Sequence, residues 1–259
     1  MQPAEVREPR LRLVSWNCAG AIAGKIGALQ ALRPDVAIIA EAASSDCALL
    51  EAKASVSGRP IWAGADNKKG LLIAAFGDWA LIPTLVHPGR EEIVARVGSG
   101  SVCLNIIALW PVQRKGGPTY TAIVADAIER HADMIKTGRT ILAGDLNASV
   151  AMAGQAGRNL TGIVNRLSQA GLQSAYHISE AVEHGEEEEP TLYWRRRGSP
   201  TDRFHIDFVF APAQMLSPGC ASVGSYTDWV ESGLSDHVPV IADLRVAAPA
   251  SAGGADGVR

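Results

Sequence analysis

The sequence has no excess of positive charge: 24 Lys and Arg residues stand against 27 Asp and Glu residues, a formal net charge of −3. Proteins dedicated to duplex DNA draw much of their affinity from a cationic face that neutralises phosphates, so this balance argues against that class. Hydrophobic residues make up 47% of the chain and charged residues 20%, which excludes disorder of the whole chain. The length of 259 residues predicts one domain, since a single core stops growing at roughly 250–300 residues.

Long hydrophobic runs are also missing. Apolar stretches such as residues 36–40 and 71–76 fall far short of the ~20 residues that span a bilayer. Charges and prolines occupy the N-terminus where a signal peptide needs an apolar block. We therefore expect a cytoplasmic protein with no stable membrane association. No internal repeat is visible, and no CxxC spacing occurs, so buried free thiols are expected for the four cysteines, Cys18, Cys47, Cys103 and Cys220.

Short apolar runs separated by turn residues predict most of the strands, and helical spacing predicts the helices. Runs of strands on both sides of a central helix favour a layered α/β architecture over a parallel doubly wound sheet. Residues 184–190 predict a charged loop. Strands are expected over 11–17, 35–42, five short runs between 60 and 111, 139–147, 191–194, 205–212 and 238–246, and helices over 24–33, 44–54, 121–136 and 159–170, the last capped by Asn159.

Polar side chains suited to chemistry gather at the ends of these apolar runs, where a rigid sheet can present them in fixed geometry. Each has a structural alternative, as a turn former, a strand-terminal charge or a helix cap. Asp207 is the hardest to explain in this way, because a carboxylate between Ile206 and Phe208 is expensive to bury without a partner. The residues concerned are Asn17, Glu41, Asp145, Asn147, Asp207, Asp236 and His237.

Together these residues supply what metal-assisted phosphoester hydrolysis requires. Mg²⁺ takes one or two carboxylates plus waters and substrate oxygens, which Glu41 with Asp145 or Asp236 can provide. Asp145 is the candidate to deprotonate the attacking water, with Asn147 donating to the phosphoryl oxygens. An imidazole stabilises charge on the transition state best when a carboxylate fixes its tautomer, a role that fits His237 with Asp207.

The ordered motifs resemble the endonuclease/exonuclease/phosphatase superfamily, which includes deoxyribonuclease I, exonuclease III-like abasic-site endonucleases, inositol polyphosphate 5-phosphatases and neutral sphingomyelinases. The resemblance runs from about Leu11 to Val246. It implies an α/β fold, a four-layer αββα sandwich in which two mixed β-sheets pack face to face with flanking helices, as in deoxyribonuclease I. It leaves residues 1–10 as an N-terminal extension and 247–259 as a flexible tail. The motifs are Trp16-Asn17, the Glu that ends DVAIIAE, GDLN at 144–147, HID at 205–207 and SDHVP at 235–239.

The resemblance also implies a role for each residue. Glu41 becomes the principal carboxylate for Mg²⁺ or Mn²⁺, with Asn17 and Asp236 supporting the ion and its waters. Asp145 orients or activates the nucleophilic water. The phosphate contacts come from Asn147 and from His237 held by Asp207.

Substrate contacts are expected from a second set of residues. Trp110 stands where many members carry a Tyr or His that touches the phosphate, and His205 stands where many carry Arg. Residues 191–197 resemble the strand that lines the abasic-sugar pocket of exonuclease III-like enzymes, with Tyr193 and Phe204 near its aromatic walls. Arg195 and the two arginines after it are suited to gripping a phosphate; the alternative is a solvated charge cluster with the nearby glutamates.

These observations predict a divalent-metal-dependent phosphoesterase acting as a monomer on a phosphoester substrate. A DNA endonuclease or exonuclease is the specific version, because local cations and a metal can dock DNA on a mildly acidic protein. The alternative is a phosphatase or phosphodiesterase acting on a small molecule or a lipid head group. A catalytically silent binding module is the remote alternative.

Overall fold

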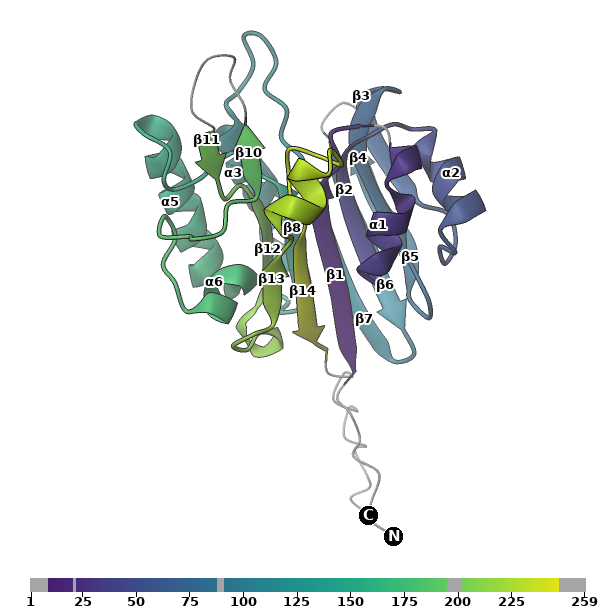
Figure 1. Cartoon of the computed structure of the whole chain (residues 1–259). Helices are drawn as coiled ribbons and strands as arrows, with labels where there is room; N and C mark the ends of the chain where they lie inside the picture. Colours follow the sequence, from purple (N-terminus) through teal and green to yellow (C-terminus); the bar gives the residue numbers. More distant parts are fainter. Residues whose placement is uncertain (1–8, 21, 88–90, 195–201, 247–259) are drawn as a thin grey trace, which may run out of the picture.

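The computed structural model describes residues 9–20, 22–87, 91–194 and 202–246, which form two six-stranded sheets and a two-stranded ribbon (Figure 1). In the first sheet the strand order is β13 (Ala221–Val223), β14 (Val240–Arg245), β1 (Arg10–Asn17), β2 (Val36–Ala42), β4 (Lys69–Ala75) and β3 (Ile61–Asp66). In the second sheet it is β5 (Ala80–His87), β6 (Glu92–Ser99), β7 (Val102–Leu109), β8 (Thr140–Asp145), β12 (Asp207–Pro212) and β9 (Leu172–Ser174). The ribbon pairs β10 (Leu192–Trp194) with β11 (Asp202–Phe204).

Both sheets are mixed. One pair in each runs parallel, β1 with β2 and β7 with β8, and the other neighbours run antiparallel. A parallel pair needs a crossover, and the helices described next supply it. The two parallel pairs therefore bring the carboxyl ends of four strands to corresponding edges of the two sheets.

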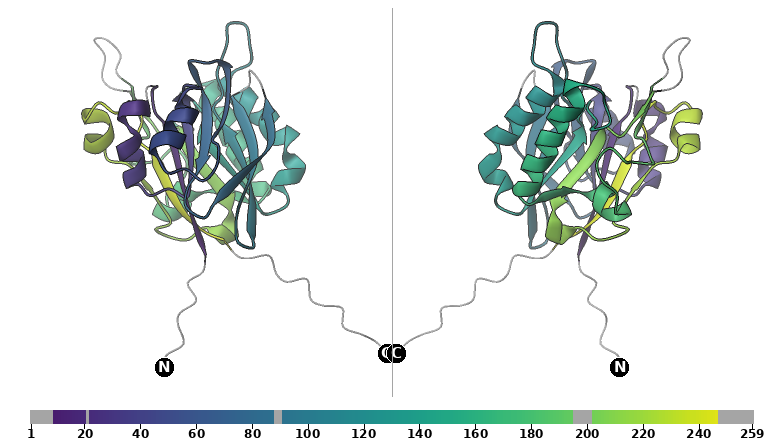
Figure 2. Two further views of the ribbon diagram at one scale, coloured as in Figure 1. Left: turned by 90° about the vertical axis from the view of Figure 1, so that its right-hand side faces the viewer. Right: turned by 90° about the vertical axis from the view of Figure 1, so that its left-hand side faces the viewer.

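Helices cover the outer face of each sheet (Figure 2). On the first sheet lie η1 (Ile22–Gly24), α1 (Ile26–Ala31), α2 (Asp46–Lys53) and the π-helical turn η3 (Thr227–Glu231). On the second lie α3 (Tyr120–Arg130), α4 (Ala132–Ile135) and α5 (Gln155–Gln169). Two short elements, α6 (Ala175–Glu180) and η2 (Ala213–Met215), add to the core between the sheets.

The side chains of β1 show how the layers are built. Leu11 and Leu13 point into the core between the two sheets, whereas Val14 and Trp16 pack under the helices of the first sheet. This alternation follows from the two-residue period of a strand. Both faces of β1 therefore carry buried apolar side chains. The result confirms the predicted four-layer αββα sandwich, and no helix of the described residues is long and apolar enough to cross a membrane.

Two helix predictions need correction. The helix expected over 121–136 is two helices, because the backbone leaves helical geometry at His131, whose ring binds Glu92 at 2.6 Å. The helix expected to begin at Asn159 begins at Gln155 after Gly154, and Asn159 lies inside it. Its side-chain amide donates to Thr121 of α3 at 3.2 Å instead of capping the helix.

Candidate active site

The carboxyl ends of β1, β2 and β8 meet at one edge of the molecule, the upper edge in Figure 1. Asn17 ends β1 and pairs with Ala40 of β2, so Glu41 follows directly beside it. The amide nitrogen of Asn17 donates to Glu41 Oε1 at 3.3 Å and to Asp145 Oδ2 at 2.9 Å. One side chain of the first sheet therefore joins a carboxylate of its own sheet to a carboxylate of the other.

Glu41 lies at a β-bulge between Ala40 and Ala42, with φ at +62°. A bulge turns a side chain away from the regular pleat, and a left-handed backbone at a residue other than glycine persists where the surroundings enforce it. The Glu41 side chain is 22% exposed, and Lys69 of β4 forms an ion pair with its carboxylate. The bulge thus aims a carboxylate outward at the sheet edge, where a cation can reach it.

Asp145 depends on the glycine that precedes it. Gly144 has φ at +145°, and a Cβ atom there would lie 1.8 Å from the carbonyl oxygen of Leu109. Only glycine allows β7 and β8 to approach so closely just before the carboxylate. The carboxylate of Asp145 accepts a hydrogen bond from the backbone N–H of Asn147 at 2.8 Å. The Asn147 side chain donates to the carbonyl of Pro111 at 3.2 Å.

Asp207 faces Asp145 because the two residues are partners in the register of β12 and β8. Its Oδ2 accepts from His237 Nδ1 at 2.8 Å, and both side chains are buried. The other oxygen, Oδ1, is buried with no hydrogen-bond partner among the described residues. One ligand atom from each of Asp145, Asp207 and His237 lies within 4.8 Å of the others.

This proximity shifts two pKa values. Burial opposes the charged ring of His237, but the carboxylate of Asp207 outweighs burial and raises the pKa of His237 to about 9. Burial, together with the charge of Asp207, raises the pKa of Asp145 to about 7, although His237 and the hydrogen bond from Asn17 act in the opposite direction. His237 is therefore a cation at neutral pH, while Asp145 is poised between its two protonation states.

Neither a protein-family model nor a curated protein matches the sequence, but solved structures match the fold. Truncated TDP2 from Caenorhabditis elegans superimposes with a TM-score of 0.66 at 14% identity, over 91% of this chain and 98% of that one. The 3′-5′ exonuclease NExo from Neisseria meningitidis superimposes with a TM-score of 0.62 at 16% identity, over 90% of this chain and 99% of that one. A third match is the endonuclease domain of TRAS1, a telomere-specific non-LTR retrotransposon. Its TM-score is 0.61 at 19% identity, over 91% of this chain and 98% of that one.

These neighbours are endonuclease/exonuclease/phosphatase structures. The chain has the fold of that superfamily. Within this fold, six of the seven strand-end residues singled out from the sequence are joined by hydrogen bonds or strand register. The seventh, Asp236, is exposed, and its backbone carbonyl accepts from the N–H of Tyr193 at 2.8 Å.

The oxygen donors at this edge fit a hard divalent cation. Glu41 offers a partly exposed carboxylate, and Asn17 Oδ1 keeps a second lone pair beyond the one that accepts from Ala19 N–H at 3.0 Å. Burial lowers the pKa of Lys25, and the charges of Asp236 and Glu41 both act in the opposite direction. Carboxylate and amide oxygens are the donors that Mg²⁺ and Mn²⁺ prefer.

Two of the residues expected to contact the substrate, His205 and Trp110, are buried. The side chain of His205 is buried at 3% exposure, donates from Nδ1 to the carbonyl of Glu189 and packs against Tyr176. The ring of His205 therefore lies in the interior, and its contact with a substrate stays a prediction. Trp110 is also buried, at 8% exposure, and packs in the core between the sheets, which favours a packing role for this side chain over a contact with substrate.

Tyr193 and Phe204 lie half-buried on the β10–β11 ribbon. A β-bridge between Leu192 and His237 joins the ribbon to the segment that carries His237. Arg195 lies outside the described residues.

Two hydroxyl groups support the site, and the sequence patterns did not single them out. Ser235 Oγ donates to the carbonyl of Asn17 at 2.8 Å and accepts from His237 N–H at 3.0 Å. Thr191 Oγ1 accepts from the backbone N–H groups of Ile206 and Asp207 at 2.9 and 3.0 Å. Ser235 stands inside the SDHVP motif, so its position was a usable signal, whereas nothing in the sequence around Thr191 marked it.

Proposed function

We propose that the protein hydrolyses phosphodiester bonds of DNA with the help of Mg²⁺ or Mn²⁺. The observation that supports the proposal best is the hydrogen-bonded chain Glu41–Asn17–Asp145, with Asp207–His237 opposite Asp145. It combines, at one edge of two sheets, oxygen donors for a cation, a carboxyl group that titrates near neutrality and a cationic imidazole. Phosphoryl transfer relies mainly on positioning and on charge stabilisation, which these groups provide.

His237 stabilises charge on the phosphate. Asp207 accepts the Nδ1 proton, so the ring is held in one orientation and Nε2 is the nitrogen left for a substrate oxygen. With its pKa raised to about 9, His237 carries a proton on Nε2 at neutral pH. It donates that hydrogen bond as negative charge accumulates on the phosphoryl oxygens.

Asp145 accepts a proton from the attacking water. A general base works best when its pKa lies near the operating pH, and the pKa of about 7 meets that condition. Asn17 and the backbone of Asn147 each hold one oxygen of the carboxylate, so its orientation is fixed before substrate binds. Asn147 has a left-handed backbone at φ +52°, and this turn directs its backbone N–H to the carboxylate while its side chain donates to the carbonyl of Pro111.

Glu41, Asn17 and Asp236 are the residues that would hold the cation. When bound, the cation supplies positive charge to the phosphate and lowers the pKa of water. Lys69, the present partner of Glu41, already shows that this carboxylate accepts a cation.

DNA is the proposed substrate because aromatic and cationic groups stand next to the catalytic loop. Trp194 is 44% exposed. Tyr193 packs against Tyr226 with ring centroids 4.9 Å apart, and the guanidinium of Arg203 lies 5.5 Å from the Tyr193 ring. Aromatic rings that stack bases and arginines that meet phosphates are typical of sites for single-stranded or opened nucleic acid. The fold neighbours TRAS1 and NExo, an endonuclease domain and an exonuclease, support this choice.

The test compares abasic, nicked and single-stranded DNA with a panel of phosphomonoesters, each with Mg²⁺ and with EDTA. We expect metal-dependent cleavage of DNA that Asp145→Asn and His237→Gln abolish. Turnover of a phosphomonoester without DNA cleavage selects the small-molecule alternative. No metal-dependent turnover of any substrate contradicts the proposal and leaves a binding module. Sedimentation of the active protein tests the expected monomer.

A further inference from the structure

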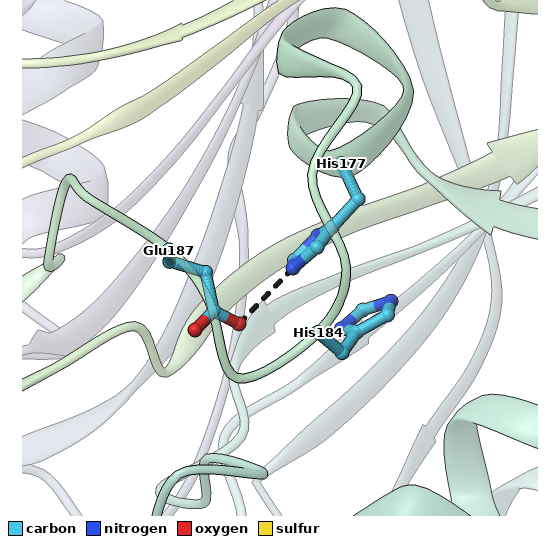
Figure 3. A group of neighbouring side chains, drawn as sticks. All are labelled: His177, His184 and Glu187. Atoms are coloured by element: carbon cyan, nitrogen blue, oxygen red, sulfur yellow. Dashed lines mark hydrogen bonds and ion pairs between the residues drawn. The ribbon is translucent and has the colours of Figure 1, made fainter.

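A second group of ligand-bearing side chains lies outside the catalytic edge. His177 comes from α6, and His184 and Glu187 come from the loop that joins α6 to β10 (Figure 3). One ligand atom from each lies within 4.8 Å of the others. None of these three residues takes part in the proposed phosphoester chemistry.

Two of the three side chains are already held together. His177 Nε2 and Glu187 Oε1 are 3.0 Å apart, and these side chains are only 6% and 5% exposed. Two donors bound to one tetrahedral zinc ion at ~2.0–2.1 Å are separated by roughly 3.3 Å. The distance between the two atoms thus needs to change little for an ion to bind between them.

His184 supplies the unsatisfied group. Its Nδ1 atom is buried and has no hydrogen-bond partner within the described part of the chain, and a buried polar atom without a partner is costly. A neutral imidazole keeps a lone pair on one ring nitrogen, and the ring of His184 lies directly against that of His177. A metal ion is a partner that such a nitrogen can take.

We propose that His177, His184 and Glu187 form a zinc site. Two imidazoles and one carboxylate form a mixed nitrogen and oxygen donor set that suits zinc, and the imidazoles disfavour Mg²⁺ and Ca²⁺. The carboxylate contributes one negative charge to the divalent ion. A fourth position is open to water through a cavity of about 470 Å³ that His177, His184 and Ser174 help to line.

Zinc binding requires one side-chain rotation. The rings of His177 and His184 are stacked, with centroids 3.5 Å apart and planes inclined by 19°, whereas a metal lies close to the plane of each imidazole that binds it. His184 is the ring that turns, because His177 is held at both nitrogens, by Ser174 Oγ at 2.7 Å and by Glu187. Ser174 Oγ can accept from Nδ1 once the ion replaces the proton on Nε2, the kind of outer contact that metal-binding histidines commonly make.

The proposed zinc site would stabilise the segment that supports Asp207 and His237. The loop that carries His184 and Glu187 runs directly into Thr191, whose hydroxyl holds the backbone of Asp207 and whose carbonyl accepts from Val238 N–H at 2.9 Å. An ion that fixes this loop to α6 restricts the segment that positions Asp207 and His237. The inference does not depend on the proposed phosphoester hydrolysis, because metal binding is measured without substrate.

The experiment strips the full chain with a chelator and titrates it with Co²⁺, and separately with Zn²⁺, in excess Mg²⁺. We expect one equivalent of Co²⁺ with the visible absorption of a tetrahedral site, and a rise in unfolding temperature with Zn²⁺. His184→Gln and Glu187→Gln should weaken binding by about 100-fold or more, given that even outer partners of metal ligands contribute 10–100-fold. Glu188→Gln, an exposed neighbour, should bind like the parent chain.

Two results overturn the proposal. One is the absence of stoichiometric binding in the parent chain. The other is binding that persists in Glu187→Gln but is lost in His237→Gln, which assigns the ion to the catalytic cluster. Circular dichroism of each metal-free variant shows whether it is folded, and because His184 is only half-buried, its variant keeps the test valid if Glu187→Gln is unstable.

Discussion

Two buried histidine–carboxylate pairs lie in different settings. His237 and Asp207, 2.8 Å apart, stand where strands of the two sheets meet, whereas His177 and Glu187, 3.0 Å apart, join a short helix to a loop. Strand register fixes the first pair: Asp207 is the direct partner of Asp145. No register fixes the second pair, which is held by the turns of the loop.

The two clusters also hold protons differently. In the catalytic cluster the pKa values of Asp145 and His237 are raised, so protons are retained. In the second cluster the pKa values of His184 and Glu187 are lowered, so protons are released. A cluster that retains protons is suited to acid–base chemistry, and one that releases them is suited to binding a metal.

The largest expected effect separates the clusters by activity. His237→Gln or Asp207→Asn should lower kcat by about 10²–10⁴-fold, the range for loss of a catalytic proton donor or of a group that stabilises transition-state charge. His177→Gln, the matched change in the second cluster, should lower kcat far less, because its ring contacts no reacting group. Steady-state kinetics on the best DNA substrate check this, and equal losses in both clusters would refute the division of roles.

The next expected effect is that the two clusters make the stability of the metal-free protein depend on pH in opposite directions. Asp145, with a folded pKa of about 7 against 3.8, and His237, with about 9 against 6.5, contribute stability at low pH that is lost as pH rises through their folded values. The contribution of these two groups to the free energy of unfolding should therefore fall between about pH 4 and 9, by up to ~1.4 kcal/mol per pH unit for each group while it titrates.

The second cluster acts in the other direction. Glu187, with a folded pKa of about 2 against 4.5, and His184, with about 3 against 6.5, contribute stability that is present above pH 6.5 and lost as pH falls through the folded values. Urea unfolding in EDTA across this range reports the sum of both trends in the parent chain, and one variant from each cluster separates them. Asp145→Asn should reduce the fall of the free energy of unfolding near neutral pH, and Glu187→Gln should reduce its loss in acid. If Asp145→Asn changed the acid loss and Glu187→Gln the fall near neutral pH, the assignment would be contradicted.

A smaller effect concerns the ion-pair partner in the second cluster. Glu187→Gln should destabilise the metal-free protein by roughly 1–3 kcal/mol, because it replaces a charged acceptor of the buried His177 ring. Glu188→Gln, on an exposed side chain, should change stability by less than about 0.5 kcal/mol. Urea denaturation at neutral pH with EDTA measures the difference. Equal effects of the two changes would show that burial of Glu187 contributes nothing.

The same contrast explains what could be predicted from the sequence. The strand-end residues were recognisable because strands are visible as apolar runs and the register then brings their ends together, as it does for Asp145 and Asp207. His177, His184 and Glu187 lie on a six-residue helix and a loop, where no period links sequence spacing to proximity. The HGEEEEP segment was interpreted as a charged loop, and only the structure shows that Glu187 turns inward.

Short and buried features were missed for related reasons. β9, β11 and β13 are three residues each, too short for a two-residue period to be detected. His205 is expected to contact substrate because it stands where many members of the superfamily carry Arg, but nothing in the sequence shows what surrounds this position. In the structure its ring lies in the interior, against Tyr176 and Phe208.

The smallest expected effect concerns Lys69, the side chain that now forms an ion pair with Glu41. Lys69 is 57% exposed and pairs with Glu41, so Lys69→Met should change stability by less than about 1 kcal/mol. It should nevertheless lower the Mg²⁺ concentration that gives half-maximal activity, because the ammonium group competes with the ion for the same carboxylate. Lys68→Met, a change at an exposed neighbour, should leave this concentration unaltered. A rise for Lys69→Met would instead show that Lys69 binds the substrate phosphate, making this lysine part of the catalytic edge and not a competitor for its metal.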